Sequence, residues 1–67
     1  SLEELHRLIE RLGPLYSIPF LMFFKGYSYN EIGEELNIPL GTVKSRIFLA
    51  RTKMQHQLKL TNAAQLA

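Results

Sequence analysis

The sequence predicts an all-α fold, a single small domain of four helices. Four segments of the 67-residue chain carry apolar side chains at helical spacing, and Gly or Pro residues separate most of these segments. No internal repeat and no low-complexity stretch divides the chain. A chain of this length buries only about 60% of the surface that its unfolded state exposes, so the core is expected to be modest.

The first predicted helix covers residues 2–12. Its apolar side chains recur at steps of three or four, and they are Leu2, Leu5, Leu8 or Ile9, and Leu12. Gly13 and Pro14 end this helix, because Gly is suited to a left-handed cap and Pro to the first position of the element that follows.

The segment from 14 to 25 is almost entirely apolar. Its large apolar residues are Leu15, Ile18, Phe20, Leu21, Phe23 and Phe24. By periodicity alone the run fits a buried strand, but flanking helices and the absence of a partner strand favour a buried helix. Pro19 cannot donate a backbone hydrogen bond, so either the helix bends there or Ser17 caps a helix whose first turn contains Pro19.

A third helix is predicted after Gly26, ending at about Leu36. Ser28 and Glu31 stand at the spacing of a capping box, in which each side chain accepts a hydrogen bond from the other residue's backbone N–H. The turn that follows reads Asn37-Ile38-Pro39. Asn is, after Gly, the residue that best tolerates a left-handed backbone.

The last predicted helix is the longest, from about Leu40 to about Leu58. Its single apolar stripe consists of Val43, Ile47, Ala50, Met54 and Leu58. Residues 61–67 have little to pack against and are expected to form a frayed tail, which leaves residues 1–60 as the domain.

The third and fourth helices fit the pattern of a helix-turn-helix. Such a unit needs a small residue in its first helix, a left-handed-tolerant residue in the turn and an apolar residue early in its second helix. Gly33, Asn37 and Val43 occupy these positions. An ordinary helical hairpin can show the same spacing, so spacing alone leaves both interpretations open.

The net charge of +2 conceals an asymmetry that favours DNA binding. Residues 1–35 contain all six Glu and three basic residues, a net −3, whereas residues 36–67 contain five basic residues and no acid, a net +5. A solvated basic helix face is the ordinary explanation of such a cluster. Here, however, the cluster coincides with the second helix of the helix-turn-helix, and DNA is the polyanion that such a helix meets.

The outer face of the last helix follows from a rotation of about 100° per residue. Opposite the apolar stripe lie Ser45, Phe48, Leu49 and Thr52, flanked by Lys44, Arg51 and Gln55 on one side and by Arg46 and Lys53 on the other. In a major groove, Phe48 can contact a thymine methyl group while Lys44 or Arg51 reaches guanine acceptors. A contact with another protein is the alternative; Phe48 favours DNA, and for Leu49 both remain open.

The most specific string in the chain is Pro39-Leu40-Gly41-Thr42-Val43-Lys44-Ser45-Arg46. Together with the rest of residues 26–51, it closely resembles region 4 of bacterial sigma factors of the sigma-70 family, in the pattern of the extracytoplasmic-function group. The similarity extends over roughly residues 5–58. It implies a domain that binds the −35 promoter element and the flap of the RNA polymerase β subunit, directing polymerase to promoters in transcription initiation.

The resemblance also implies roles for individual residues. It places Lys44, Ser45 and Phe48 at the base edges, and Tyr29, Thr42 and Arg46 at phosphates. The helix geometry adds Arg51 to the base-reading set, and Lys53 is expected at a phosphate.

Two positions depart from the family pattern. Position 49 is often basic in the family and is Leu here, which removes a base or phosphate contact. Gly33 replaces the usual Ala, which lowers helix propensity by up to about 1 kcal/mol but suits a close helix approach.

Catalysis is not expected. The chain has no Cys, Asp or Trp, and it shows no Ser-His-acid or phosphate-cradling arrangement. His6 and Glu10 stand four residues apart but lack a third ligand, so we expect neither a metal nor another cofactor, and no small-molecule substrate. The longest apolar run, residues 18–24, is far shorter than the roughly 20 residues that span a bilayer, so a cytoplasmic protein without a membrane partner is expected.

Two other functions stay open at this point. A sigma-like decoy that binds an anti-sigma factor is suggested by Leu49 on the outer face. The helix-turn-helix of another regulator, such as a response-regulator output domain, is the second, although the long helix beyond Arg51 argues against it. Because the chain starts at Ser1 rather than Met, we also expect it to be a piece of a larger protein. The resemblance implies that region 4 is tethered to a second promoter-binding domain, and the sequence leaves open whether such a domain precedes Ser1.

Overall fold

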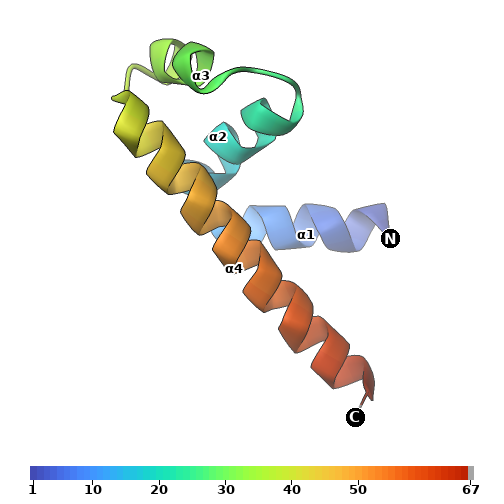
Figure 1. Ribbon diagram of the computed structural model, residues 1–67. Coiled ribbons are helices and arrows are strands. Elements are labelled where there is room, and N and C mark those ends of the chain that lie inside the picture. The colour runs from blue at the N-terminus through green and yellow to red at the C-terminus, as the bar shows by residue number, and fades with distance from the viewer. Residues whose placement is uncertain (67) are drawn as a thin grey trace.

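The computed structural model describes the backbone of residues 1–66 and the side chains of residues 1–60. The described chain contains no strand and consists of four helices: α1 (Leu2–Leu12), α2 (Pro14–Phe24), α3 (Tyr29–Leu36) and α4 (Leu40–Leu66). In Figure 1, α4 runs diagonally along the molecule, and α1, α2 and α3 pack against its N-terminal part. The predicted all-α, four-helix fold is confirmed.

Helix α1 is capped at both ends. The Ser1 hydroxyl accepts a hydrogen bond from the Glu4 backbone N–H at 3.3 Å, in a capping box that the sequence analysis missed. Gly13 ends the helix with φ 80° and ψ 155°, a positive φ as expected but an extended ψ rather than a left-handed one. The predicted apolar face is buried only at its C-terminal end, since Leu2 is 75% exposed.

Helix α2 is continuous from Pro14 to Phe24 and contains Pro19 in its interior. The alternative prediction, in which the helix begins at a Ser17 cap, is therefore wrong. Pro19 is fully buried, and its packing offsets the hydrogen bond that its nitrogen cannot donate. The expectation of a buried helix holds for one side only, because Leu15, Ile18 and Phe24 on the other side are 53%, 46% and 70% exposed.

A Schellman motif ends α2 and turns the chain toward α3. Gly26 adopts φ 103°, and its N–H donates to the Phe23 carbonyl at 3.1 Å. The N–H of Tyr27 donates to the Met22 carbonyl, also at 3.1 Å, so two of the last carbonyls of the helix are satisfied. The predicted stop at Gly26 is confirmed, and only a residue without a Cβ adopts this φ without strain.

Both local devices predicted for α3 are present. The Ser28 backbone N–H donates to the Glu31 carboxylate at 2.8 Å, and the Glu31 N–H donates to the Ser28 hydroxyl at 3.1 Å. These bonds, the backbone one foremost, lower the pKa of Glu31 below its ordinary value of 4.5. Asn37 follows the helix in the left-handed conformation, with φ 54° and ψ 50°.

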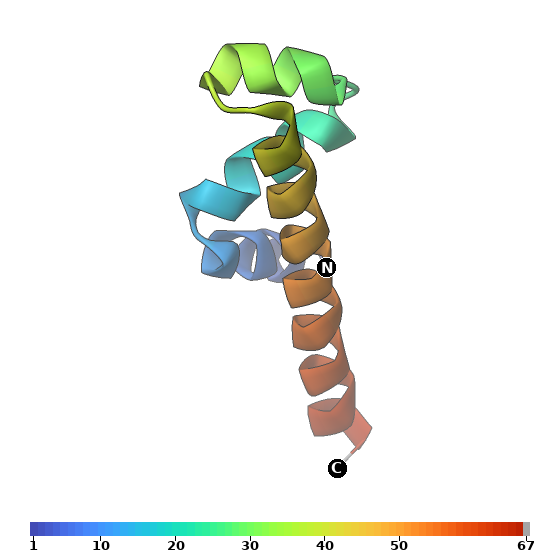
Figure 2. The ribbon, with the colours of Figure 1, turned by 60° about the vertical axis from the view of Figure 1, so that its left-hand side comes forward.

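The core is a single layer of side chains between α4 and the other helices. Its buried members are Leu8, Leu12, Phe20, Ile32, Val43, Ile47, Ala50 and Met54. In Figure 2, α1 and α2 lie beside α4, and α3 crosses the N-terminal end of α4. This is the arrangement that the core requires.

Helix α4 extends beyond its predicted end at Leu58, as far as Leu66. The sequence contains no Gly or Pro after Gly41, so no residue type that breaks helices interrupts it. The predicted apolar stripe is buried through Met54, whereas Leu58 is 46% exposed. The expected frayed tail, 61–67, lies outside the residues whose side chains are described.

Candidate nucleic-acid interface

The rotation of α4 about its axis is fixed by its buried stripe. Val43 and Ala50 are completely buried and Ile47 nearly so, each against the helices that cover this side. The start of α4 is also held, because the backbone N–H groups of Thr42 and Val43 both donate to the Pro39 carbonyl. The opposite side of α4 therefore faces solvent in a single defined orientation.

Of the four residues predicted to read bases, Ser45 and Phe48 lie on this solvent-facing side, and Lys44 and Arg51 lie on one flank of it. Lys44, Ser45, Phe48 and Arg51 are all exposed. They span seven residue steps, or about 10 Å of helix axis, which corresponds to about three base pairs. Thr52 is exposed as well, but its hydroxyl donates to the Phe48 carbonyl at 3.1 Å and is occupied within the helix.

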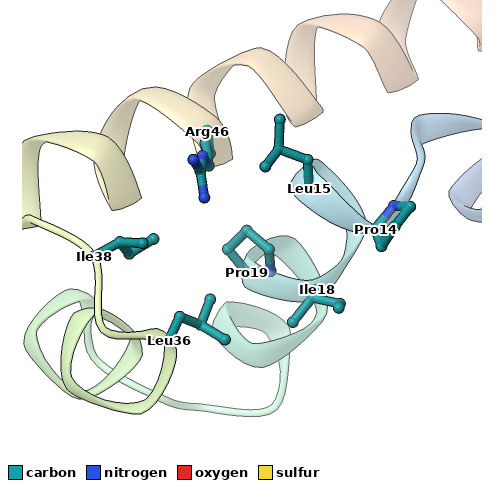
Figure 3. Close-up of a pocket in the computed structure, with 7 residues that line it drawn as sticks. All are labelled: Pro14, Leu15, Ile18, Pro19, Leu36, Ile38 and Arg46. Atoms are coloured by element: carbon teal, nitrogen blue, oxygen red, sulfur yellow. The ribbon is translucent and has the colours of Figure 1, made fainter.

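Two of the residues predicted at phosphates lie on the flank of α4 that faces α2. Figure 3 shows the Arg46 side chain extending into a groove of about 290 Å³. The remaining lining is apolar and comes from α2, the end of α3 and the turn: Pro14, Leu15, Ile18, Pro19, Leu36 and Ile38. The Lys53 ammonium lies 5.1 Å from the centre of the Tyr16 ring on α2, a cation–π contact.

The other two predicted phosphate contacts lie near the start of α3 and the start of α4. The Tyr29 ring stacks on Phe23, with centroids 5.1 Å apart and an interplanar angle of 23°, and both rings are half-buried. Tyr29 and Leu40 line one hollow beside the turn, so Tyr29 is close to the N-terminus of α4. Thr42 is half-buried in the first turn of α4.

A comparison with protein families decides what this helix-turn-helix is. The model of sigma-70, region 4, matches residues 2–54. The chain belongs to this family. Region 4 is a non-enzymatic DNA-binding family whose members act at the −35 promoter element in transcription initiation and associate with RNA polymerase. Comparisons with curated proteins and with solved structures give no match.

The match to region 4 coincides with the packed part of the domain. It ends at Met54, the last buried residue of the α4 stripe. The helix continues to Leu66, so residues 55–66 lie outside the family match, and the described side chains of 55–60 lie outside the core.

Two basic side chains of this region 4 domain, Lys44 and Arg51, are available to an anion. Within the part of the chain whose side chains are described, the one ion pair joins the amino group of Ser1 to Glu4 at 3.4 Å. Lys44 and Arg51 form none with another described residue, and both are exposed. All six Glu lie on α1 and α3, so no carboxylate of α4 competes with DNA.

Two other kinds of feature, a metal-ligand cluster and a membrane-spanning helix, are absent from the described residues. They contain no group of three His, Cys, Asp or Glu side chains that could hold a metal ion. No helix among them is both long and apolar enough to cross a membrane.

Sequence reasoning missed the engagement of Arg46 and Lys53 with α2. A helical wheel gives the direction of a side chain but not the helix that it meets. Tyr16, at one end of the Lys53 contact, belongs to an apolar segment whose periodicity did not indicate which side faces α4.

Proposed function

We propose that this region 4 domain recognises the −35 element as part of an extracytoplasmic-function sigma factor in the bacterial cytoplasm. The observation that supports the proposal is the exposed, acid-free face of α4, with Lys44 and Arg51 unpaired among the described residues. Second helices of helix-turn-helix units enter the major groove in this way.

The base-reading residues are then Lys44, Ser45, Phe48 and Arg51. Lys44 and Arg51 reach guanine acceptors, Phe48 contacts a thymine methyl group, and the Ser45 hydroxyl bonds to either kind of base. The helix is fixed by its core, so the contacts form without reordering the backbone.

Phosphate contacts position the helix, and they come from Tyr29, Thr42, Arg46 and Lys53. The two basic members extend from the α4 flank opposite Lys44 and Arg51, about 180° around the helix, and so face the other DNA strand. To reach it, Arg46 leaves its groove and Lys53 leaves the Tyr16 ring. We therefore expect each of them to contribute less affinity than a basic side chain that gives up no contact within the domain.

The groove that contains Arg46 is the surface that we assign to RNA polymerase, with the β flap as its occupant. Its lining is apolar apart from Arg46, and it lies on the flank away from Lys44 and Arg51. A protein segment in this groove leaves the base-reading side free. Simultaneous binding matters because tethering to polymerase makes the weak DNA contact effectively intramolecular.

Fluorescence anisotropy on a duplex with a family-type −35 sequence tests the DNA-binding proposal. We expect DNA binding to be weaker in both Lys44→Ala and Arg51→Ala. A residue that contacts phosphate should, when replaced, reduce the slope of log K against log salt by about 1, and a residue that contacts bases should relax the base preference. Arg7→Ala, an exposed change of equal charge on α1, serves as the matched control. If all three variants behave alike, the recognition assignment fails.

The second candidate function is a sigma-like decoy that binds an anti-sigma factor. Its support is the apolar pair on the outer face, Phe48 at 64% and Leu49 at 39% exposure. Specific capture by an anti-sigma factor, together with no DNA binding at low salt, would favour this candidate over the first.

A further inference from the structure

We propose that Phe48 and Leu49 form a thymine-reading pair, so that the preferred −35 element of this protein carries two closely spaced thymines at the centre of the α4 contact. The inference rests on the proposed DNA-binding function and specifies its ligand. It assigns a role to Leu49, an apolar residue on the outer face of α4.

The geometry gives these two residues the central place on the outer face. Measured from the direction opposite the buried stripe, Phe48 and Leu49 point about 50° to either side, and the charged flanks lie about 90–110° away. Ser45 and Thr52 lie close to the centre line, one turn before and one turn after the pair. The part of α4 that would reach deepest into a groove is thus uncharged.

Neither side chain belongs to the buried core. Phe48 is 64% exposed and Leu49 is 39% exposed. Leu49 does not line the groove between α2 and α4 either. The Thr52 hydroxyl is bonded to the Phe48 carbonyl, which leaves it no free donor for a base beside the pair.

The chemistry of the major groove offers this pair one partner. The 5-methyl group of thymine is the apolar group that the four base pairs present there, whereas guanine, adenine and cytosine offer hydrogen-bonding atoms. A side chain of carbon alone gains nothing from those atoms and leaves them without partners when it excludes water. Two apolar side chains on adjacent residues therefore select two thymines on neighbouring base pairs.

The expected size of the effect follows from burying one methyl group. Its loss should weaken binding about fourfold at each of the two thymines. An effect of this size is readily measured by competition anisotropy.

The test replaces thymine with deoxyuracil, which lacks the 5-methyl group and leaves Watson–Crick pairing intact. The 67-residue chain first selects duplexes from a randomised library at low salt, and every thymine of the best duplex is then exchanged singly. Two exchanges are expected to weaken binding about fourfold. In the Leu49→Ala variant, one of these two deoxyuracil exchanges should no longer weaken binding. In the Phe48→Ala variant, the other exchange should no longer weaken binding.

The controls separate a base contact from a general loss of stability. Leu49→Ala should fold, because the residue is partly exposed and Ala is the best helix former. Leu60→Ala makes the same change at another exposed leucine of α4, about 16 Å along the axis, and should keep both methyl effects. Leu49→Arg should lose one methyl effect and gain affinity for guanine at that position.

Each outcome of the test is informative. If selected duplexes bind with clear sequence preference but no thymine exchange matters, or if Leu49→Ala retains both methyl effects, the thymine-reading pair is refuted and the DNA-binding proposal stands. If selection yields no sequence preference at all, the DNA-binding proposal fails and the pair falls with it. Loss of binding to polymerase or another protein alone in Leu49→Ala would show that the residue is a protein contact.

Discussion

Replacing Gly33 by Ala tests a close approach between α3 and the turn of the helix-turn-helix. A Cβ at this position would lie 3.0 Å from the Ile38 carbonyl oxygen and 3.6 Å from the Val43 Cγ2 atom. The carbonyl is backbone and cannot rotate away as a side chain would. The N–H of the same residue, Ile38, is also fixed, because it donates to the Gly33 carbonyl at 3.0 Å.

Two effects of similar size therefore oppose each other in Gly33→Ala. Helix propensity gains about 0.5–1 kcal/mol, while a contact of 3.0 Å requires the turn to shift by a few tenths of an ångström. Gly41 on α4 is the matched control, because a Cβ there meets nothing within 4 Å and its φ is not positive. We expect Gly33→Ala to gain less than half of the stability that Gly41→Ala gains.

Thermal and urea unfolding followed by circular dichroism measures the difference. Gly41→Ala should raise Tm by about 2–8 °C, and Gly33→Ala should leave it nearly unchanged. Gly33→Val should lower stability by about 1–3 kcal/mol, because its extra carbons overpack the turn. Equal gains at the two glycines would refute the close approach as a determinant of this fold.

Three further predictions concern the core, a cap and a titration. Ile47→Ala should cost about 2–5 kcal/mol in urea unfolding, whereas Phe48→Ala beside it should cost less than about 1 kcal/mol; similar losses would contradict the burial of α4. Gly26→Ala should cost about 1–2 kcal/mol, because φ is 103° and no added contact compensates; an unchanged Tm would contradict this backbone conformation. The folded-state pKa of Glu31 is lowered, so its stabilisation is present above pH 4.5 and is lost as pH falls through the folded pKa. Glu31→Gln should make Tm less dependent on pH in that acidic range. If the dependence of Tm on pH were the same as in the unsubstituted protein, the result would argue against the capping box.

Local features of this chain were predictable because their causes are local. The capping box of Ser28 and Glu31, the stop at Gly26 and the left-handed Asn37 each depend on a few neighbouring residues, and all three are present. The helical spacing of Val43 to Met54 also predicted the buried side of α4 correctly. For the same reason, the exposure of the four base-reading candidates could be predicted.

Features that depend on the extent of the domain could not be predicted. Periodicity showed that Leu2, Leu5 and Leu58 share a face with core residues, but not that the packed layer ends before reaching them. The sequence left two positions for the start of α2, because the cost of an interior Pro19 is offset by tertiary burial that no local pattern records. The helical spacing likewise predicted the flank of α4 on which Arg46 lies, but it did not predict the groove that Arg46 enters.

The core and the reading surface are two sides of the same helix, so they are mechanically coupled. Side-chain tips on α4 lie about 5 Å from its axis, so a rotation of about 10° moves a base-reading atom by about 1 Å. A displacement of that size is large compared with the tolerance of a hydrogen bond to a base edge. Volume changes at Val43, Ile47 or Ala50 are therefore expected to alter promoter preference as well as stability, although none of these residues faces DNA. If the proposed function holds, variation in the core offers this protein a route to new promoters that leaves every proposed base-reading residue in place.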